Sequence, residues 1–303
     1  MCPNTGSCET DDRDEPRKPV KVMLVQMTPT LADKDANFNT FKKFIVKAKS
    51  ENVNLVVFPE LSTTGYLNYD GFYRLAEPIP GPFTSKVAAL LAGSTVHVVF
   101  GMPEASTEVD GALYNSAVMI GGKKGLIGKY RKLFLPGHSV FDEKRYFTPG
   151  STAEVFSTCL GDIGLAICYD LYFPELARLY AMKGAQIIVY PTTSPSARRD
   201  YFEALTKARA IENGVFVILC NRAGIEEGLI YWGGSHIVSP YGVVLAKAKY
   251  DEDDVVITEL DLGEVRRARP LLPMLSKDTR HELYDDLLRQ QKETRSPQME
   301  DEK

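Results

Sequence analysis

Three residues with reactive side chains follow apolar segments of the chain: Glu60, Lys132 and Cys168. The segment Gly164-Leu-Ala-Ile-Cys168 is typical of a short strand, and the next residues predict a sharp turn and a helix that begins near Pro174. Such a turn presents a thiol at a helix N-terminus, where unpaired N–H groups favour a thiolate and can hold a developing oxyanion. These residue types indicate a cysteine nucleophile assisted by a carboxylate and an ammonium group.

Five segments, taken in order, resemble the nitrilase superfamily, the carbon–nitrogen hydrolases that use a Glu-Lys-Cys triad. They are Phe58-Pro-Glu60-Leu-Ser-Thr-Thr-Gly-Tyr66, Tyr130-Arg-Lys132-Leu-Phe-Leu-Pro136, Phe141-Asp-Glu143-Lys-Arg-Tyr-Phe-Thr-Pro-Gly150, the Cys168 segment, and Ala208-Arg-Ala-Ile-Glu212-Asn213 followed by Asn221-Arg-Ala-Gly224, a mainly structural stretch in the family. The resemblance extends from about Val20 to Tyr284. It implies a cysteine-dependent amidohydrolase of the amidase or N-carbamoyl amine hydrolase branch.

The resemblance also implies a role for each catalytic residue. Glu60 is expected to take the proton of Cys168, return one to the leaving nitrogen and later activate water. Lys132 is expected to hold the oxyanion together with the backbone N–H of Tyr169. The matching glutamate in similar amidases orients the lysine or the substrate nitrogen, and Glu143 takes that role here.

Five residues near these motifs are expected to contact the substrate: Tyr66, His138, Tyr169, Tyr172 and Thr193. His138 stands between the Lys132 and Glu143 motifs, which favours a place at the mouth of the pocket.

Each catalytic residue also has an ordinary structural interpretation. A cysteine that ends an apolar strand is often a core thiol, and Cys159 and Cys220 are interpreted in that way. Glu60 could be a carboxylate at the start of a helix, and Lys132 could belong to a solvated basic face. Glu143 could form a surface ion pair with a neighbouring lysine.

Composition narrows the class of protein. The chain has 303 residues, 44% of them hydrophobic, which suffices for a large core. A net charge of −4 gives no basic field for nucleic acid, so a small-molecule substrate is expected. No apolar run approaches the roughly 18 residues of a membrane helix. Zinc, nucleotide-phosphate and dinucleotide motifs are absent from the sequence, so no cofactor or metal is expected.

Five cysteines make an odd number without paired CxxC spacing, which favours reduced thiols and a cytoplasmic protein. Cys2 and Cys8 could be metal ligands, but two ligands do not complete a tetrahedral site. Residues 1–19 are polar and are expected to form a disordered tail, residues 20–289 one hydrolase domain, and residues 290–303 a polar C-terminal tail.

Strands and helices alternate along the body, and the resemblance implies a four-layer α-β-β-α sandwich of the α/β class. Strands are predicted at Val20–Gln26, Asn54–Phe58, Val96–Gly101, Ser116–Ile120, Gly125–Tyr130, Gly164–Ile167, Gln186–Tyr190, Val215–Cys220, Ser235–Val238, Val243–Ala246 and Val255–Leu260. Helices are predicted at Asp33–Ser50, Thr84–Leu91, Pro174–Lys183, Asp200–Asn213 and Arg280–Arg289. Similar proteins pair through the helices near Pro174 and Asp200, so a homodimer or a higher homo-oligomer is expected.

The substrate is less well defined by the sequence. Many true nitrilases carry Cys-Trp-Glu at the nucleophile, whereas Cys168-Tyr-Asp170 is similar to amidases and carbamoylases. Relatives with carboxylate substrates often carry an arginine three or four residues after the cysteine, where this chain has Leu171 and Tyr172. A small neutral or cationic amide or N-carbamoyl amine is therefore expected, although Arg198 or Arg199 could supply a positive charge. A nitrilase and a catalytically inactive binding subunit are the alternatives.

Overall fold

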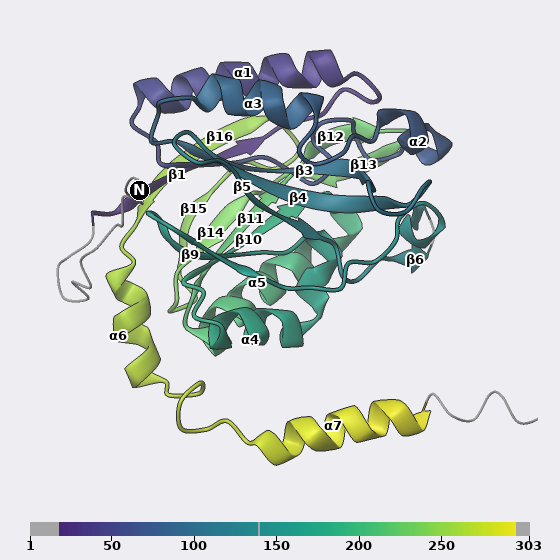
Figure 1. Ribbon diagram of the computed structural model, residues 1–303. Helices are drawn as coiled ribbons and strands as arrows, with labels where there is room; N and C mark the ends of the chain where they lie inside the picture. Colours follow the sequence, from purple (N-terminus) through teal and green to yellow (C-terminus); the bar gives the residue numbers. More distant parts are fainter. Residues whose placement is uncertain (1–17, 139, 295–303) are drawn as a thin grey trace, which may run out of the picture.

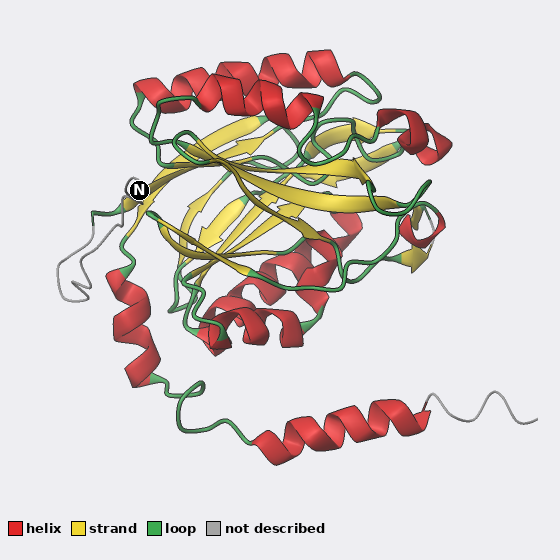
Figure 2. Cartoon of the chain, viewed as in Figure 1, coloured by secondary structure: helices red, strands yellow, loops and turns green. Residues whose placement is uncertain are grey.

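Two six-stranded sheets pack face to face and carry helices on their outer faces, as Figures 1 and 2 show for the computed structural model, which describes residues 18–138 and 140–294. Helices α1 (Lys34–Ser50) and α3 (Pro82–Leu91) cover one sheet, while α4 (Pro174–Met182) and α5 (Arg199–Asn213) cover the other. The expected four-layer α-β-β-α sandwich is therefore confirmed.

The first sheet has the strand order β16-β1-β2-β3-β4-β5. Its strands are β1 (Val20–Gln26), β2 (Leu55–Val57), β3 (His97–Ala105), β4 (Leu113–Gly121), β5 (Gly125–Arg131) and β16 (Asp254–Leu260). The strands β1, β2 and β3 run parallel, and the outer pairings are antiparallel.

The second sheet has the order β15-β14-β11-β10-β9-β8. Its strands are β8 (Val155–Thr158), β9 (Gly161–Leu165), β10 (Ile187–Thr192), β11 (Phe216–Asn221), β14 (His236–Val238) and β15 (Val244–Lys247). Here β9, β10 and β11 form the parallel centre, again with antiparallel neighbours.

Shorter elements surround the sandwich. They are the helix α2 (Phe72–Leu75), the hairpins β6–β7 (Gly137–His138 and Phe141–Asp142) and β12–β13 (Ala223–Glu226 and Leu229–Trp232), and four short 3₁₀ helices, η1 (Tyr69–Gly71), η2 (Glu143–Arg145), η3 (Cys168–Tyr172) and η4 (Ser196–Arg198). The chain then continues through α6 (Gly263–Leu271) to α7 (His281–Thr294), which lies apart from the sandwich in Figure 1.

Apolar side chains explain why the layers stay together. The inner faces of both sheets form one buried core that includes Val57, Val99, Leu165 and Val189, while α1 and α3 close a second core over the first sheet. The thiol of Cys220 is buried between the sheets, where Sγ lies 3.2 Å from the carbonyl oxygen of Val57 in the opposite sheet. The sandwich thus brings the ends of strands from both sheets into contact.

The strands and helices expected from the sequence all occur, with ends that differ by a few residues. The short strand β8, the hairpin β12–β13 and the helix α6 were not expected, because their patterns are too short or too polar to stand out. Helix α7 extends to Thr294, into the segment expected to be a polar tail. The N-terminal tail up to residue 17, with Cys2 and Cys8, and residues 295–303 lie outside the described residues.

One cysteine was placed wrongly. Cys159 is exposed rather than buried, because it lies in the turn that joins β8 to β9. The interpretation of Cys220 as a core residue is confirmed.

A close backbone contact fixes the position of Glu60 relative to β3. A Cβ atom at Gly101 would lie 2.6 Å from the Cα atom of Glu60 and 2.5 Å from the backbone nitrogen of Leu61. Only glycine lets strand β3 approach the turn after β2 this closely. The Gly101 amide also donates a hydrogen bond to the carbonyl oxygen of Pro59.

We therefore predict that Gly101→Ala displaces the Glu60 turn and lowers the free energy of unfolding by about 1–3 kcal/mol, the usual cost of overpacking. Chemical denaturation measures this change. Gly71→Ala is the matched control, because its Cβ would meet only the Cβ of Asn68, at 3.7 Å. Equal stabilities for the two variants would contradict the assigned role of Gly101.

Candidate active site

Two carboxylates share one buried ammonium group. The Nζ atom of Lys132 lies 2.7 Å from Oε1 of Glu60 and 2.6 Å from Oε1 of Glu143. Glu60 and Lys132 are each 1% exposed and Glu143 is 3% exposed, so all three charges are removed from water. The structure excludes a solvated basic face for Lys132 and a surface ion pair for Glu143.

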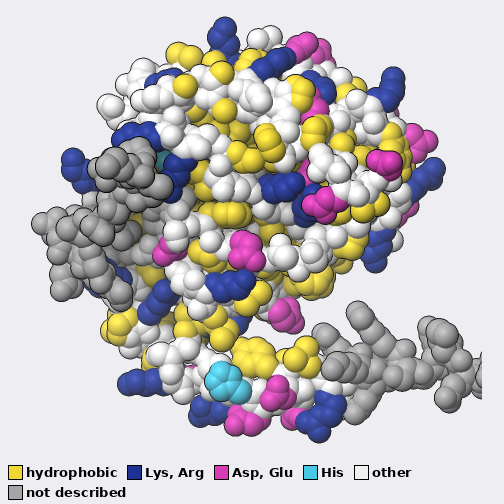
Figure 3. Space-filling model, in the orientation of Figure 1, with side chains coloured by type: hydrophobic (Ala, Val, Ile, Leu, Met, Phe, Trp, Pro, Cys, Tyr) yellow, Lys and Arg dark blue, Asp and Glu magenta, His cyan; other side chains and the backbone are white. Residues whose placement is uncertain are grey.

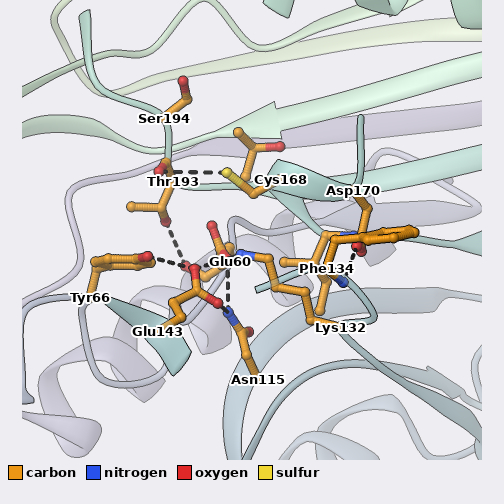
Figure 4. Close-up of polar contacts among 12 residues, drawn as sticks. Glu60, Tyr66, Asn115, Lys132, Phe134, Glu143, Cys168, Asp170, Thr193 and Ser194 are labelled. Atoms are coloured by element: carbon orange, nitrogen blue, oxygen red, sulfur yellow. Dashed lines mark hydrogen bonds and ion pairs between the residues drawn. The ribbon is translucent and has the colours of Figure 1, made fainter. Parts of the chain in front are cut away.

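Neutral side chains complete this cluster (Figure 4). The amide nitrogen of Asn115 donates to Oε1 of Glu60 at 2.8 Å and to Oε2 of Glu143 at 3.1 Å. The hydroxyl of Tyr66 donates to Oε1 of Glu143 at 2.5 Å. In the part of the chain that the structure describes, Oε2 of Glu60 has no hydrogen-bond partner. That oxygen is therefore available to accept a proton.

Burial and neighbouring charges of opposite sign shift the pKa values of Glu60 and Lys132 in opposite directions. Desolvation raises the pKa of Glu60 to about 7, although the Lys132 cation opposes this effect. Burial favours a neutral Lys132, but Glu143 and Glu60 outweigh it and raise the pKa of the ammonium group above its ordinary value. Lys132 is therefore a permanent cation, whereas Glu60 can exchange a proton near neutral pH.

Cys168 lies at a strained turn after β9. Its φ angle of +42° is in the left-handed region, which residues other than glycine rarely adopt, and it begins the five-residue 3₁₀ helix η3. The helix α4 then begins at Pro174, as expected. Strained turns of this kind commonly hold functional residues in a fixed orientation.

Burial outweighs the effect of the helix N-terminus on the protonation of Cys168. Burial raises the pKa of the Cys168 thiol well above its usual value, and the Glu60 carboxylate raises it further. The short helix η3 and the Lys132 cation do not offset the loss of hydration. The thiol is therefore neutral at rest and would need a base in order to act as a nucleophile.

Asp170 holds the cysteine turn against the segment that carries Lys132. Its carboxylate accepts hydrogen bonds from the backbone N–H of Ile167 at 2.8 Å, the backbone N–H of Phe134 at 3.0 Å and the hydroxyl of Tyr130 at 2.8 Å. These donors come from both sides of the site. Burial raises the pKa of Asp170 to about 6, which leaves it mainly ionised at neutral pH.

Thr193, which follows β10, connects Cys168 to Glu60. Its hydroxyl donates to the carbonyl oxygen of Glu60 at 3.0 Å, and its own carbonyl oxygen lies 3.7 Å from Sγ of Cys168. Figure 4 shows Thr193 between these two residues. The contact joins the two sheets at the site.

An ion pair from the stretch expected to be mainly structural supports Tyr66. Arg222 pairs with Glu226, and both side chains are buried. The other oxygen of Glu226 accepts the backbone N–H groups of Tyr66 at 2.9 Å and Leu67 at 2.7 Å. The sequence contains no signal for this support, because its parts are far apart in the chain.

A cavity of about 380 Å³ opens beside Cys168. Tyr66, Glu143, Tyr169, Tyr172, Thr193 and His138 all line it, so the residues expected to contact the substrate lie together. The rings of His138 and Tyr169 are 5.9 Å apart, and those of Tyr169 and Tyr172 are 5.3 Å apart. His138 is exposed, which agrees with a place at the mouth.

The described residues contain neither a helix long and apolar enough to cross a membrane nor a group of three or more His, Cys, Asp or Glu side chains arranged to hold a metal ion. Asn115 and Asp170 are the site residues that sequence reasoning missed. A polar residue inside the buried strand β4 was the available signal for Asn115.

Comparisons with known proteins agree with this site. Residues 21–270 match the family described as carbon-nitrogen hydrolase. The chain is 38% identical over 271 residues to a nitrilase of Pyrococcus abyssi, covering 88% of this chain and 99% of that protein. It is 33% identical over 276 residues to the human omega-amidase NIT2, covering 87% and 96% of the two chains.

A solved structure supports the same assignment. The carbon-nitrogen hydrolase of Helicobacter pylori G27 superposes with a TM-score of 0.83 and 28% sequence identity, covering 89% of this chain and 99% of the other. The chain therefore belongs to the carbon–nitrogen hydrolases of the nitrilase superfamily, which confirms the enzyme class expected from the order of its motifs.

Proposed function

We propose that the protein is an amidase that hydrolyses small linear amides through a thioester on Cys168. The observation that carries this proposal is the pairing of a neutral buried thiol with Glu60, whose pKa of about 7 and unpartnered Oε2 suit a general base. The relative named omega-amidase supports amide hydrolysis.

In the first half of the proposed reaction, Sγ of Cys168 attacks the amide carbon and its proton passes to Glu60. The Lys132 ammonium and the backbone N–H of Tyr169 stabilise the oxyanion, and Glu143 keeps Lys132 in place through their 2.6 Å contact. Glu60 then protonates the nitrogen, the C–N bond breaks, and ammonia or an amine leaves. The acyl group remains bound to sulfur.

In the second half, Glu60 removes a proton from water as the water attacks the thioester. The carbon–sulfur bond then breaks, the thiol regains its proton and a carboxylic acid is released. No other proton acceptor is required, because one carboxylate serves both halves in turn.

N-carbamoyl amines would fit the same chemistry, since they also present an amide-like carbon to the thiol. A nitrilase is the second candidate, because the relative from Pyrococcus abyssi bears that name. The Cys168-Tyr-Asp170 sequence favours the amidase. An inactive binding subunit would have no need for a complete buried cluster of Glu60, Lys132, Glu143 and Cys168.

We predict that wild-type protein releases ammonia from a short primary amide faster than from the corresponding nitrile, and that Cys168→Ala abolishes this release while the protein stays folded. Mass spectrometry of quenched wild type should show an acyl adduct on Cys168. Cys159→Ala is the matched control, because Cys159 is an exposed thiol in a turn away from the site. Full activity in Cys168→Ala would refute covalent catalysis, and faster release from nitriles would favour the second candidate.

The proposed base predicts the pH dependence of the reaction. With a pKa of about 7, Glu60 is mainly protonated below that pH and cannot accept the thiol proton. We expect kcat/KM for a primary amide to fall about tenfold per pH unit below pH 7. Steady-state kinetics from pH 5 to 9 measure the profile, and Glu60→Gln should lower kcat at least about a hundredfold. A profile that stays level down to pH 5 would contradict this role.

We also propose that the enzyme is a cytoplasmic homodimer or a higher homo-oligomer. Free thiols at Cys159, Cys168 and Cys220 support a reducing compartment. Helix α7 carries exposed Leu283, Tyr284, Leu287 and Leu288. Figure 3 shows hydrophobic side chains along the edge of α7 that faces the sandwich. A second copy of the chain would cover this apolar stripe.

Light scattering after size-exclusion chromatography should therefore give about 67 kDa or a multiple, where one chain has 33.7 kDa. Leu283→Ser combined with Leu287→Ser should shift the mass toward the monomer, because both side chains lie on the exposed stripe. A wild-type monomer with full activity would refute the proposal.

A further inference from the structure

The cavity beside Cys168 contains one positive charge that the proposed reaction does not use. Among the described side chains that line it, Glu143 and Arg198 are the formally charged ones. Glu143 makes a 2.6 Å ion pair with Lys132, which it shares with Glu60. Arg198 makes no ion pair within the described part of the chain, so its positive charge is available to a ligand in the cavity.

The local structure of the chain does not require a positive charge at position 198. Arg198 ends η4 and is the N-cap residue of the 15-residue helix α5, where the helix dipole disfavours a cation. Its guanidinium group lies 5.6 Å from the centre of the Tyr201 ring. Arg199, the next residue, pairs with Asp200, lies over the Tyr250 ring and does not line the cavity. The two neighbouring arginines therefore have different surroundings.

Part of the wall of this cavity is aromatic. Tyr172 and Phe202 line the cavity, with their rings edge to face at 5.6 Å. Burial raises the pKa of the Tyr172 hydroxyl, and the Arg198 cation partly offsets this effect, so Arg198 acts electrostatically on that wall. An apolar chain would pack against these rings, and a charged group at its end would meet the guanidinium group.

We propose that Arg198 selects amide substrates that carry a carboxylate at the end opposite to the reacting amide. This proposal rests on the proposed amidase function and deepens it. It departs from the expected neutral or cationic substrate, because the positive charge comes from the loop after β10 rather than from the residues next to Cys168. Guanidinium and carboxylate groups also match in geometry, which favours a paired interaction.

The test compares three amides of similar length: succinamate, which is anionic, butyramide, which is neutral, and 4-aminobutanamide, which is cationic. Wild type should prefer succinamate. Arg198→Gln should raise KM for succinamate at least about tenfold, a typical effect of losing a charged hydrogen bond, with little change in kcat or in butyramide hydrolysis. Arg199→Gln is the matched control and should behave like wild type. An unchanged preference in Arg198→Gln would overturn the proposal.

A binding measurement separates this proposal from the proposed reaction. In the inactive Cys168→Ala background, succinamate should raise the melting temperature, and adding Arg198→Gln should remove that shift. Arg198-dependent binding without turnover by wild type would refute the amidase and retain Arg198 as an anion-binding residue. If wild type hydrolyses butyramide but Arg198→Gln has no effect on succinamate binding, the proposed role of Arg198 is refuted and the amidase function is retained. Absence of both binding and turnover would refute both proposals.

Discussion

The buried contact of Lys132 with Glu60 and Glu143 is the constraint on which the rest of the structure depends. Two carboxylates this close at a buried site would repel each other, and without a nearby cation one of them would take up a proton. The positive charge of Lys132 lets both carboxylates lie close together in the interior. Asn115, on the neighbouring strand β4, donates hydrogen bonds to both of them. Because a broken buried ion pair leaves an uncompensated charge, each partner constrains the position of the others.

Burial also determines which groups of the site carry a proton at neutral pH. The same loss of hydration that raises the pKa of Glu60 to about 7 keeps the Cys168 thiol neutral. In the proposed mechanism, the thiol of Cys168 passes its proton to Glu60 as the carbon–sulfur bond forms. The positive charge of Lys132 is retained throughout, because its carboxylate neighbours raise its pKa.

The sandwich positions the backbone segments that carry the residues of this cluster. Glu60 follows β2 of one sheet, while Cys168 and Thr193 follow β9 and β10 of the other. Ligand sites commonly form at the carboxyl ends of parallel strands, and here two such edges face each other. The hydrogen bond from Thr193 to the Glu60 backbone, between residues 133 positions apart, joins them. Asp170 and the Arg222–Glu226 pair fix the turns on either side.

The sequence by itself determined the family and the central strands and helices, and it singled out Glu60, Lys132, Glu143 and Cys168, which the structure brings together, because local apolar patterns and motif order carry that information. Tertiary structure alone decided the protonation of Cys168, which depends on burial by distant residues. It also decided the roles of Asn115 and Asp170, whose partners lie on other elements. The sequence offered Arg198 and Arg199 equally as a source of positive charge, since the two look alike in a local pattern. Only the tertiary structure shows that Arg198 lines the cavity beside Cys168 and that Arg199 does not.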